Sequence, residues 1–175
     1  MLGIYLANRW VRRPRPEESL DKALKALDDT YRLYHYPSLP CDHILLTPSG
    51  VVALEVVNLA GSFSYRDHRW KEAMTIGRAL RYIVEPRVND PFVVSAELTE
   101  SLRRWFRERV PAAADLPIKA LTVFTHPSVD LELEDQSIPA LKVAKLRKQA
   151  LPQGSRLGAD LHTELADRLQ RATIG

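Results

Sequence analysis

The sequence predicts an α/β fold of the α+β type, in which helices flank a mixed β-sheet. Two observations support this prediction. Apolar residues recur at helical spacing over residues 16–28 and again over 91–109. Apolar runs of strand length, bounded by turn residues, lie between and after these helices, most clearly at 43–58 and 118–125. One sheet with helices on its faces is the economical way to bury such a mixture.

The first helix has clear boundary signals. Pro16 suits its first turn, Glu17 and Glu18 place negative charge at the positive end of the helix dipole, and Asp28-Asp29 ends it. We expect the remaining elements in this order: a strand at 31–36, a hairpin at 43–47 and 51–58, a second hairpin at 62–65 and 69–71, a helix at 74–84, a helix from Asn89-Asp90-Pro91 to Arg109, strands at 118–125, 129–133 and 141–143, a basic helix at 144–151 and a final helix at 158–172.

These elements predict three parts of the chain. Residues 1–15 form a basic leader, residues 16–151 form the domain, and residues 152–175 carry a helix that packs on the domain or on a partner. The 175 residues suffice for one domain with a real core, and the net charge of +3 does not select a function. Cys41 is the only cysteine and no apolar run reaches membrane-span length, so we expect a cytoplasmic protein.

The central hairpin carries one carboxylate at the far end of each strand. The residues Pro48, Ser49 and Gly50 favour a β-turn, because Pro is preferred at the second position of a type I turn and Gly at the fourth. If Pro48 and Ser49 are the two loop residues, Asp42 lies directly opposite Glu55, with Cβ atoms about 4.5–5.5 Å apart. Two carboxylates that close together repel each other and favour a bound cation. A three-residue loop with Gly50 in a left-handed bulge is the alternative, and its shifted register would put the two acids on opposite faces.

The order αβββαβ, with an acid opening the second strand and another ending the third, resembles the PD-(D/E)XK nuclease superfamily. More narrowly, it resembles the nuclease-related domain (NERD) family over residues 17–151. The most specific part is Asp42-His43, the turn, Glu55, and then Asn58 and Gly61. The resemblance implies a restriction-endonuclease-like core with an added hairpin.

The resemblance also implies a catalytic site. Asp42 and Glu55 would bind Mg²⁺, and a first-helix acid, Glu17 or Glu18, would be the supporting carboxylate. Oxygen ligands are what this ion requires. In such nucleases the ion polarises a phosphodiester and delivers an activated water.

Two departures from the family pattern weaken the expected catalysis. Glu55-Val56-Val57 stands where the family has Glu-x-Lys, and Val94 stands where a glutamine is expected. Strand alternation puts residue 57 on the same face as Glu55. In the family, this lysine orients the attacking water and neutralises charge that develops on phosphorus. Losing one electrostatic contact of this kind typically lowers the rate by a factor on the order of 10²–10³. A cation relocated from the following hairpin is the alternative, with these candidates: Arg66, Arg69 and Lys71.

A basic segment follows the central hairpin and is the candidate nucleic-acid surface, with Tyr65 and Trp70 as stacking side chains. The residues expected to contact phosphates are Arg66, Arg69, Lys71 and Arg78, with Arg81 and Arg87 nearby. The alternative is a solvated face over a hairpin core of aromatic side chains.

We therefore expect a protein that binds DNA or RNA and has weak or lost metal-dependent phosphodiester hydrolysis. A non-catalytic protein-interaction module, with a homodimer through helix 158–172, is one alternative. An active Mg²⁺-dependent nuclease with a relocated cation is the other.

Overall fold

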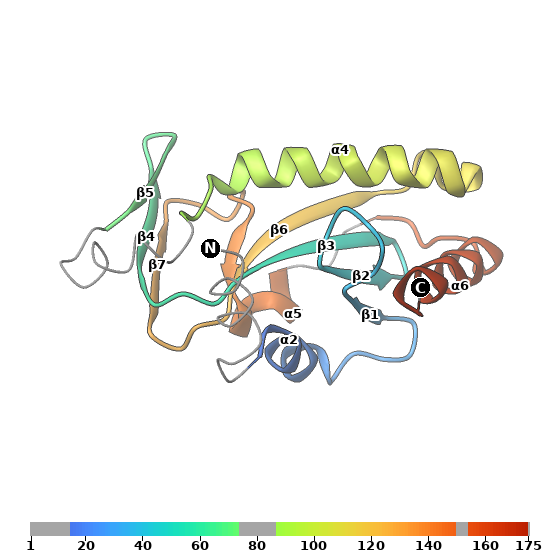
Figure 1. The fold of residues 1–175 in the computed structure, drawn as a ribbon, viewed down its shortest axis with the longest axis horizontal. Coiled ribbons are helices and arrows are strands. Elements are labelled where there is room, and N and C mark those ends of the chain that lie inside the picture. The colour runs from blue at the N-terminus through green and yellow to red at the C-terminus, as the bar shows by residue number, and fades with distance from the viewer. Residues whose placement is uncertain (1–14, 74–86, 150–153, 175) are drawn as a thin grey trace.

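The computed structural model of the chain describes residues 15–73, 87–149 and 154–174. Figure 1 shows the described elements, which are in chain order: α2 (Pro16–Leu24), β1 (Arg32–His35), β2 (His43–Thr47), β3 (Gly50–Val57), β4 (Gly61–Arg66), β5 (Arg69–Glu72), α4 (Pro91–Arg109), the 3₁₀ turn η1 (Pro111–Ala113), β6 (Ile118–Phe124), β7 (Val129–Leu133), β8 (Ala140–Lys142), the 3₁₀ turn η2 (Val143–Lys145), α5 (Leu146–Gln149) and α6 (Ala159–Ile174).

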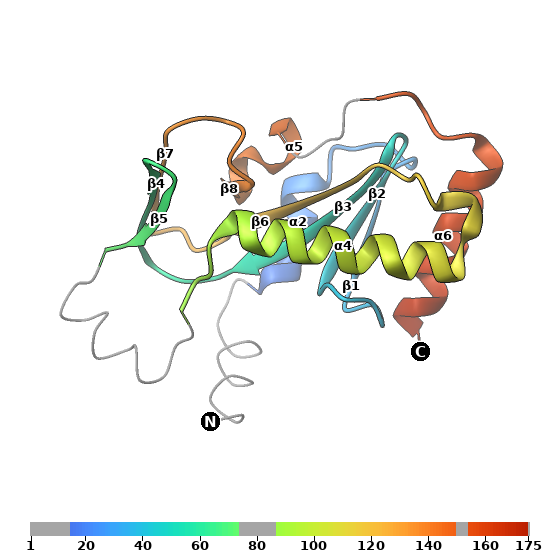
Figure 2. The ribbon, with the colours of Figure 1, turned by 90° about the horizontal axis from the view of Figure 1, so that it is seen from above.

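The main sheet is mixed and has the strand order β1-β2-β3-β6-β8. The pairs β1–β2 and β2–β3 are antiparallel, whereas β3–β6 and β6–β8 are parallel. Helix α4 covers one face of this sheet and α2 the other, and α6 packs beside β1 (Figures 1 and 2). The predicted αβββαβ order and the mixed sheet flanked by helices are both confirmed.

Alternation along the strands divides the core between the two helices. Ile44 and Ala53 belong to one buried cluster with Leu102 of α4. Leu45 and Val52 belong to a second cluster on the opposite face, which also contains Leu20 and Leu24 of α2. Strand β3 is covered on both faces, which explains why its sequence is continuously apolar rather than alternating.

Helix α4 begins and ends where its sequence predicts. The Asp90 side chain caps the helix by accepting a hydrogen bond from the Phe92 amide at 2.9 Å, and Pro91 occupies the first helical position. Arg107 and Arg109 lie in the last turn, at the negative end of the helix dipole.

The second hairpin forms a sheet of its own, which the sequence does not predict. Strands β4 and β5 pair as expected, but β4 also pairs in parallel with β7, giving the order β5-β4-β7. The hairpin turn places Asp67 and His68 at φ values of 50° and 57°, as in the type I′ turns that match the twist of two strands. The rings of Phe63 of β4 and Phe124 of β6 pack against each other at a tilt of 44° and join this sheet to the main sheet.

Three helices differ from expectation or stay untested. Helix α2 ends at Leu24 instead of continuing to residue 28. The basic segment expected as one helix at 144–151 is divided between η2 and the short α5. The helix predicted at 74–84 falls outside the described residues.

The apolar face of α6 is buried within the chain, since Leu165 and Leu169 are fully buried in the cluster under α4. Whether the protein forms a homodimer stays a prediction. Within the described ranges, no helix is both long enough and apolar enough to cross a lipid bilayer.

Candidate functional site

The turn between β2 and β3 has two loop residues, Pro48 and Ser49. Thr47 pairs with Gly50, and the Thr47 hydroxyl donates a hydrogen bond to the Gly50 carbonyl at 2.9 Å while accepting one from the Ser49 amide at 3.3 Å. Gly50 has φ of 149°, and a Cβ there would lie 2.3 Å from the Pro117 carbonyl oxygen. Glycine is required because β6 begins in direct contact with this turn. The three-residue bulged loop is not formed.

This turn sets the register that the sequence predicts. His43 pairs with Leu54, so the next pair toward the open end of the hairpin is Asp42 and Glu55. Alternation places both carboxylates on the face of Ile44 and Ala53, which is the face covered by α4. Both residues are half-buried. The predicted register is therefore confirmed, and the two acids lie on one face of the sheet.

The thiol of Cys41 is buried beside the two acids. Burial first, and then the negative charges of Asp42 and Glu55, together raise the pKa of this thiol to about 12. Both carboxylates therefore act on the same buried sulfur atom. Neutral and buried, this thiol is an inert neighbour of the pair rather than a nucleophile.

Thr122 adds a third oxygen to this face, which sequence reasoning missed. It pairs with Glu55 across the parallel strands β3 and β6, and its neighbour Ala120 lies in the cluster under α4. Thr122 is only 2% exposed, and its Oγ1 has no hydrogen-bond partner. Buried hydroxyls nearly always have a partner, so this one needs an explanation. A threonine inside the otherwise apolar run of residues 120–124 was the available signal.

The two departures from the family pattern lie on different elements, Val57 at the end of β3 and Val94 in the first turn of α4. Val57 pairs with Phe124 and packs against the aromatic cluster that also contains Phe63. Val94 precedes Leu98 by one helical turn, and Leu98 packs into the cluster under α4. Neither position therefore carries a polar side chain.

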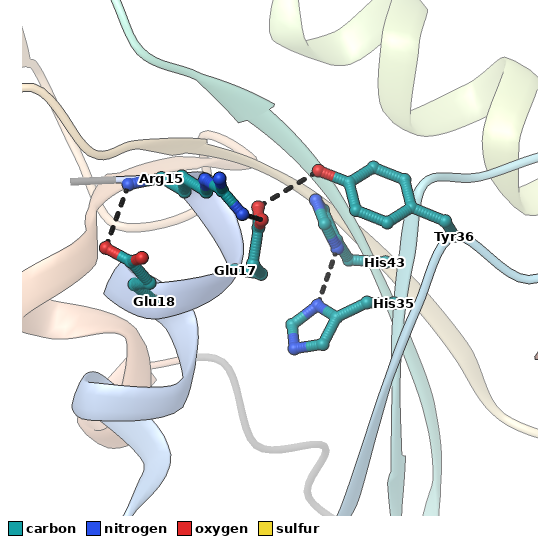
Figure 3. Close-up of polar contacts among 6 residues, drawn as sticks. All are labelled: Arg15, Glu17, Glu18, His35, Tyr36 and His43. Atoms are coloured by element: carbon teal, nitrogen blue, oxygen red, sulfur yellow. Dashed lines mark hydrogen bonds and ion pairs between the residues drawn. The ribbon is translucent and has the colours of Figure 1, made fainter. Parts of the chain in front are cut away.

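The structure does not bring Glu18 to the carboxylate pair. Helix α2 packs on the opposite face of the sheet. Figure 3 shows that the Glu18 carboxylate accepts a hydrogen bond from the Arg15 amide at 3.3 Å, which caps the start of α2. Glu17 accepts a hydrogen bond from the Tyr36 hydroxyl at 3.1 Å and lies 4.0 Å from the Arg15 guanidinium.

A histidine pair continues this polar network at the same end of the sheet (Figure 3). The Nδ1 atoms of His35 and His43 lie 2.9 Å apart, and His35 Nε2 lies 3.2 Å from an Asp21 oxygen. The Tyr36 ring packs against the His43 ring, and the Tyr36 amide donates to the Asp42 carbonyl at 2.6 Å. The network therefore ties α2 to the backbone of Asp42.

The candidate nucleic-acid residues lie on the second sheet. Arg66 pairs directly with Arg69, and alternation puts Lys71 on the same exposed face. On this face the Arg66 guanidinium bonds the Glu132 carboxylate of β7 at 2.6 Å. Arg78 falls outside the described residues.

The two aromatic residues of the hairpin are core residues. Tyr65 is 7% exposed, and the Trp70 ring stacks on Phe63 with ring centroids 5.7 Å apart. The Trp70 indole also donates to the Val88 carbonyl at 3.2 Å. This matches the alternative of a hairpin core under a solvated face.

The donor set at the carboxylate pair consists of oxygen atoms. Within the described residues, no group of three or more His, Cys, Asp or Glu side chains is placed to hold a metal ion. Mg²⁺ does not need such a group, because it is usually bound by one or two carboxylates and keeps several waters. Asp42 and Glu55, with the unpartnered Thr122 hydroxyl beside them, therefore fit a hard cation and not a thiolate-seeking or imidazole-seeking metal.

An αβββαβ core with paired acids at the ends of its second and third strands is that of a restriction-endonuclease-like nuclease domain. The family model for the nuclease-related domain, NERD, matches residues 15–125. This match covers more than half of the chain, which therefore belongs to the NERD family. No curated protein and no solved structure matches the sequence.

Proposed function

We propose that this protein binds DNA or RNA in the cytoplasm and that its metal-dependent phosphodiester hydrolysis is weak or lost. One observation carries the proposal. The hairpin register puts Asp42 and Glu55 opposite each other on one face, while Val57, on the same face two residues further, packs into an aromatic cluster. Family membership supplies the nucleic-acid context.

Asp42 and Glu55 are the residues that would hold Mg²⁺, which supplies a polarised phosphate and an activated water when bound. The Thr122 hydroxyl lies beside Glu55 and would bond a water or phosphate oxygen at the same place. The polar network of Tyr36 fixes the Asp42 backbone and so keeps that carboxylate opposite its partner.

Weak catalysis follows from the valine at position 57. The family's lysine would orient the attacking water and neutralise charge on phosphorus, and Val57 provides neither a charge nor a donor. The expected loss in rate is on the order of 10²–10³. Relocation of the cation gains little support, because Arg66 bonds Glu132 on the separate second sheet.

A comparison of two double variants tests catalysis. Supercoiled plasmid is incubated with Mg²⁺ or Mn²⁺ and with wild type, Asp42→Ala/Glu55→Ala, or the control Asp29→Ala/Glu164→Ala. The control removes two exposed acids outside the site. We expect no nicking by the site variant. Wild type and the control should nick slowly if hydrolysis is weak, and not at all if it is lost. Measurable and equal nicking by all three would show that the pair is not catalytic.

Val57→Lys tests whether the missing cation is what limits activity. We expect nicking to increase by a factor on the order of 10²–10³ if the remaining site is intact. The same substitution combined with Asp42→Ala/Glu55→Ala must show no gain. A gain that survives loss of the acids would place the activity elsewhere.

Nucleic-acid binding is tested by a salt series. Phosphate contacts by the basic hairpin face predict an affinity that falls steeply with salt concentration. We expect Arg69→Glu/Lys71→Glu to flatten this dependence, because both side chains are exposed and neither forms an ion pair with a described residue. The absence of binding to DNA and RNA at low salt would leave the alternative, a protein-interaction module on a nuclease scaffold.

A further inference from the structure

A groove of about 850 Å³ runs along the outer edge of β6, away from the carboxylate pair. Its floor is formed by residues 118–121, and one wall by Phe92, Ser95 and Thr99 of α4. The opposite wall comes from residues 131–142 and from Lys145 and Gln149. The groove is therefore bounded on both sides, with a strand edge at its base.

The first half of this strand edge is unpaired. Strand β8 pairs only with Thr122–Phe124, the second half of β6. The Pro117 carbonyl accepts from Val51 of β3, whereas the Thr122 amide donates to Pro139 on the outer side. Alternate residues therefore point their backbone groups outward, and Ile118 and Ala120 direct theirs into the groove.

These outward groups are largely free. The Ala120 carbonyl accepts a hydrogen bond from the Ser95 hydroxyl at 3.0 Å. Among the described residues, nothing bonds the Ala120 amide, or the Ile118 amide and carbonyl, on this side. A strand edge with free donors and acceptors pairs readily with another extended chain.

The charged residues that line the groove are three lysines, Lys119 among them, and two acids. Lys142 and Lys145 line the wall opposite α4. An adjoining groove of about 460 Å³ shares Ile118 and Lys119 and is lined by Arg103 and Arg107 of α4. Within the described part of the chain, Arg107, Lys142 and Lys145 form no ion pair.

The acids that line the main groove lie near Phe92. The Glu134 amide donates to the Tyr65 carbonyl, the Tyr65 ring packs against the Phe92 ring, and Asp135 follows Glu134. Asp115 is the acid of the adjoining groove. The same end is apolar as well, because Phe92 is 41% exposed and Leu131 and Leu133 line the groove beside it. The groove therefore combines a free strand edge, an apolar end and a basic end.

We propose that this groove binds an extended acidic peptide of a partner protein, which adds a strand to the free edge of β6. The peptide main chain pairs with Ile118 and Ala120, its acidic side chains reach Lys142, Lys145 and Arg107, and an apolar side chain contacts Phe92. Main-chain pairing gives affinity and alternate side chains give specificity in this mode of recognition. A nucleic acid carries no alternating amide and carbonyl groups, so it would leave the strand edge unpaired.

The test uses a fluorescein-labelled pool of hexapeptides in which Glu or Asp alternates with Val, Leu or Phe. Binding to the full chain is followed by fluorescence anisotropy. The control pool has the same sequences with alternate backbone amides methylated, which keeps charge and apolar surface but removes strand pairing. We expect the methylated pool to bind at least about tenfold more weakly. Equal binding of the two pools, or no saturable binding of either, would overturn the proposal.

Matched charge reversals on one segment locate the site. Lys142→Glu/Lys145→Glu reverses two groove residues, whereas Arg147→Glu/Lys148→Glu reverses two exposed residues outside the groove. We expect about tenfold weaker peptide binding for the first and less than about twofold change for the second. Amide chemical shifts of Ile118 and Ala120 must also move with the peptide. If a single-stranded oligonucleotide displaces the peptide and loses affinity in the same variant, the groove binds nucleic acid instead.

The peptide test does not depend on the proposed function, because it involves neither Asp42 nor Glu55. The comparison of methylated and unmethylated peptides uses unaltered protein, so it holds even if a charge-reversal variant misfolds.

Discussion

Two buried threonines in the main sheet differ in a way that stability measurements can detect. Thr122 is 2% exposed and its hydroxyl has no partner, whereas Thr47 is 1% exposed and its hydroxyl bonds both Gly50 and Ser49. Replacing either residue by valine exchanges a hydroxyl for a methyl group of similar size. Both substitutions therefore remove a hydroxyl, one that forms no hydrogen bond and one that forms two.

The expected changes have opposite signs. A buried polar group without a partner costs about 1–3 kcal/mol, so Thr122→Val should raise the free energy of unfolding by about 1–2 kcal/mol. Thr47→Val leaves the Ser49 amide and the Gly50 carbonyl without this partner and should lower the free energy of unfolding by about 1–3 kcal/mol. The gap between the two variants is then about 2–5 kcal/mol.

Urea denaturation followed by circular dichroism measures both values, with the requirement that the slope against urea is unchanged. Equal destabilisation of the two variants would refute the reasoning, since it would mean that the Thr122 hydroxyl has a partner in solution. A stabilised Thr122→Val variant that also binds Mn²⁺ more weakly would show that the hydroxyl serves the site at the expense of stability.

Two further predictions concern the surroundings of the site. Gly50→Ala should lower the free energy of unfolding by at least about 2–3 kcal/mol, because the new Cβ lies 2.3 Å from the Pro117 oxygen at a φ of 149°; a stability equal to wild type in urea denaturation would contradict this close approach. The raised pKa of Cys41, about 12 against 9.0, means that the folded chain keeps the thiol proton while the unfolded chain loses it. The free energy of unfolding should therefore fall as pH rises above about 9, by up to ~1.4 kcal/mol per pH unit. Cys41→Ala should lack this component, and identical pH profiles for the two proteins would contradict it.

The sequence predicted those parts of the fold that depend on residues close together in the chain. The chemistry of Pro48-Ser49-Gly50 predicted the turn but allowed a loop of two or three residues. The two-residue loop that forms places Asp42 opposite Glu55, because loop length fixes the register of a hairpin. The start of α4 was equally predictable, since Asp90 and Pro91 are a cap and a first-turn residue.

Contacts between distant segments were not predictable in the same way. The pairing of β4 with β7 joins residues 61–65 to residues 129–133, and no local pattern distinguishes it from an added hairpin on the main sheet. Thr122 faces the carboxylates only because β6 pairs in parallel with β3 in one register. Helix α2 ends early because residues 24–27 form a turn in which the Leu27 amide bonds the Leu24 carbonyl.

The end of the sheet that carries Asp42 is held by contacts from both sides. Glu17 bonds the Tyr36 hydroxyl, and Tyr36 in turn bonds the Asp42 backbone with its own φ at 50°. A non-glycine residue in this region is uncommon and persists when surrounding contacts hold it. The network therefore gives α2 a positioning role even though Glu18 does not lie with the carboxylate pair.

A Mn²⁺ titration followed by electron paramagnetic resonance tests most directly whether Asp42 and Glu55 act together as one hard-cation site. Wild type and Asp29→Ala/Glu164→Ala should bind the ion alike, and Asp42→Ala/Glu55→Ala should lose that binding. Equal Mn²⁺ binding by all three proteins would show that the two carboxylates, although they share one face of the sheet, do not form a cation site.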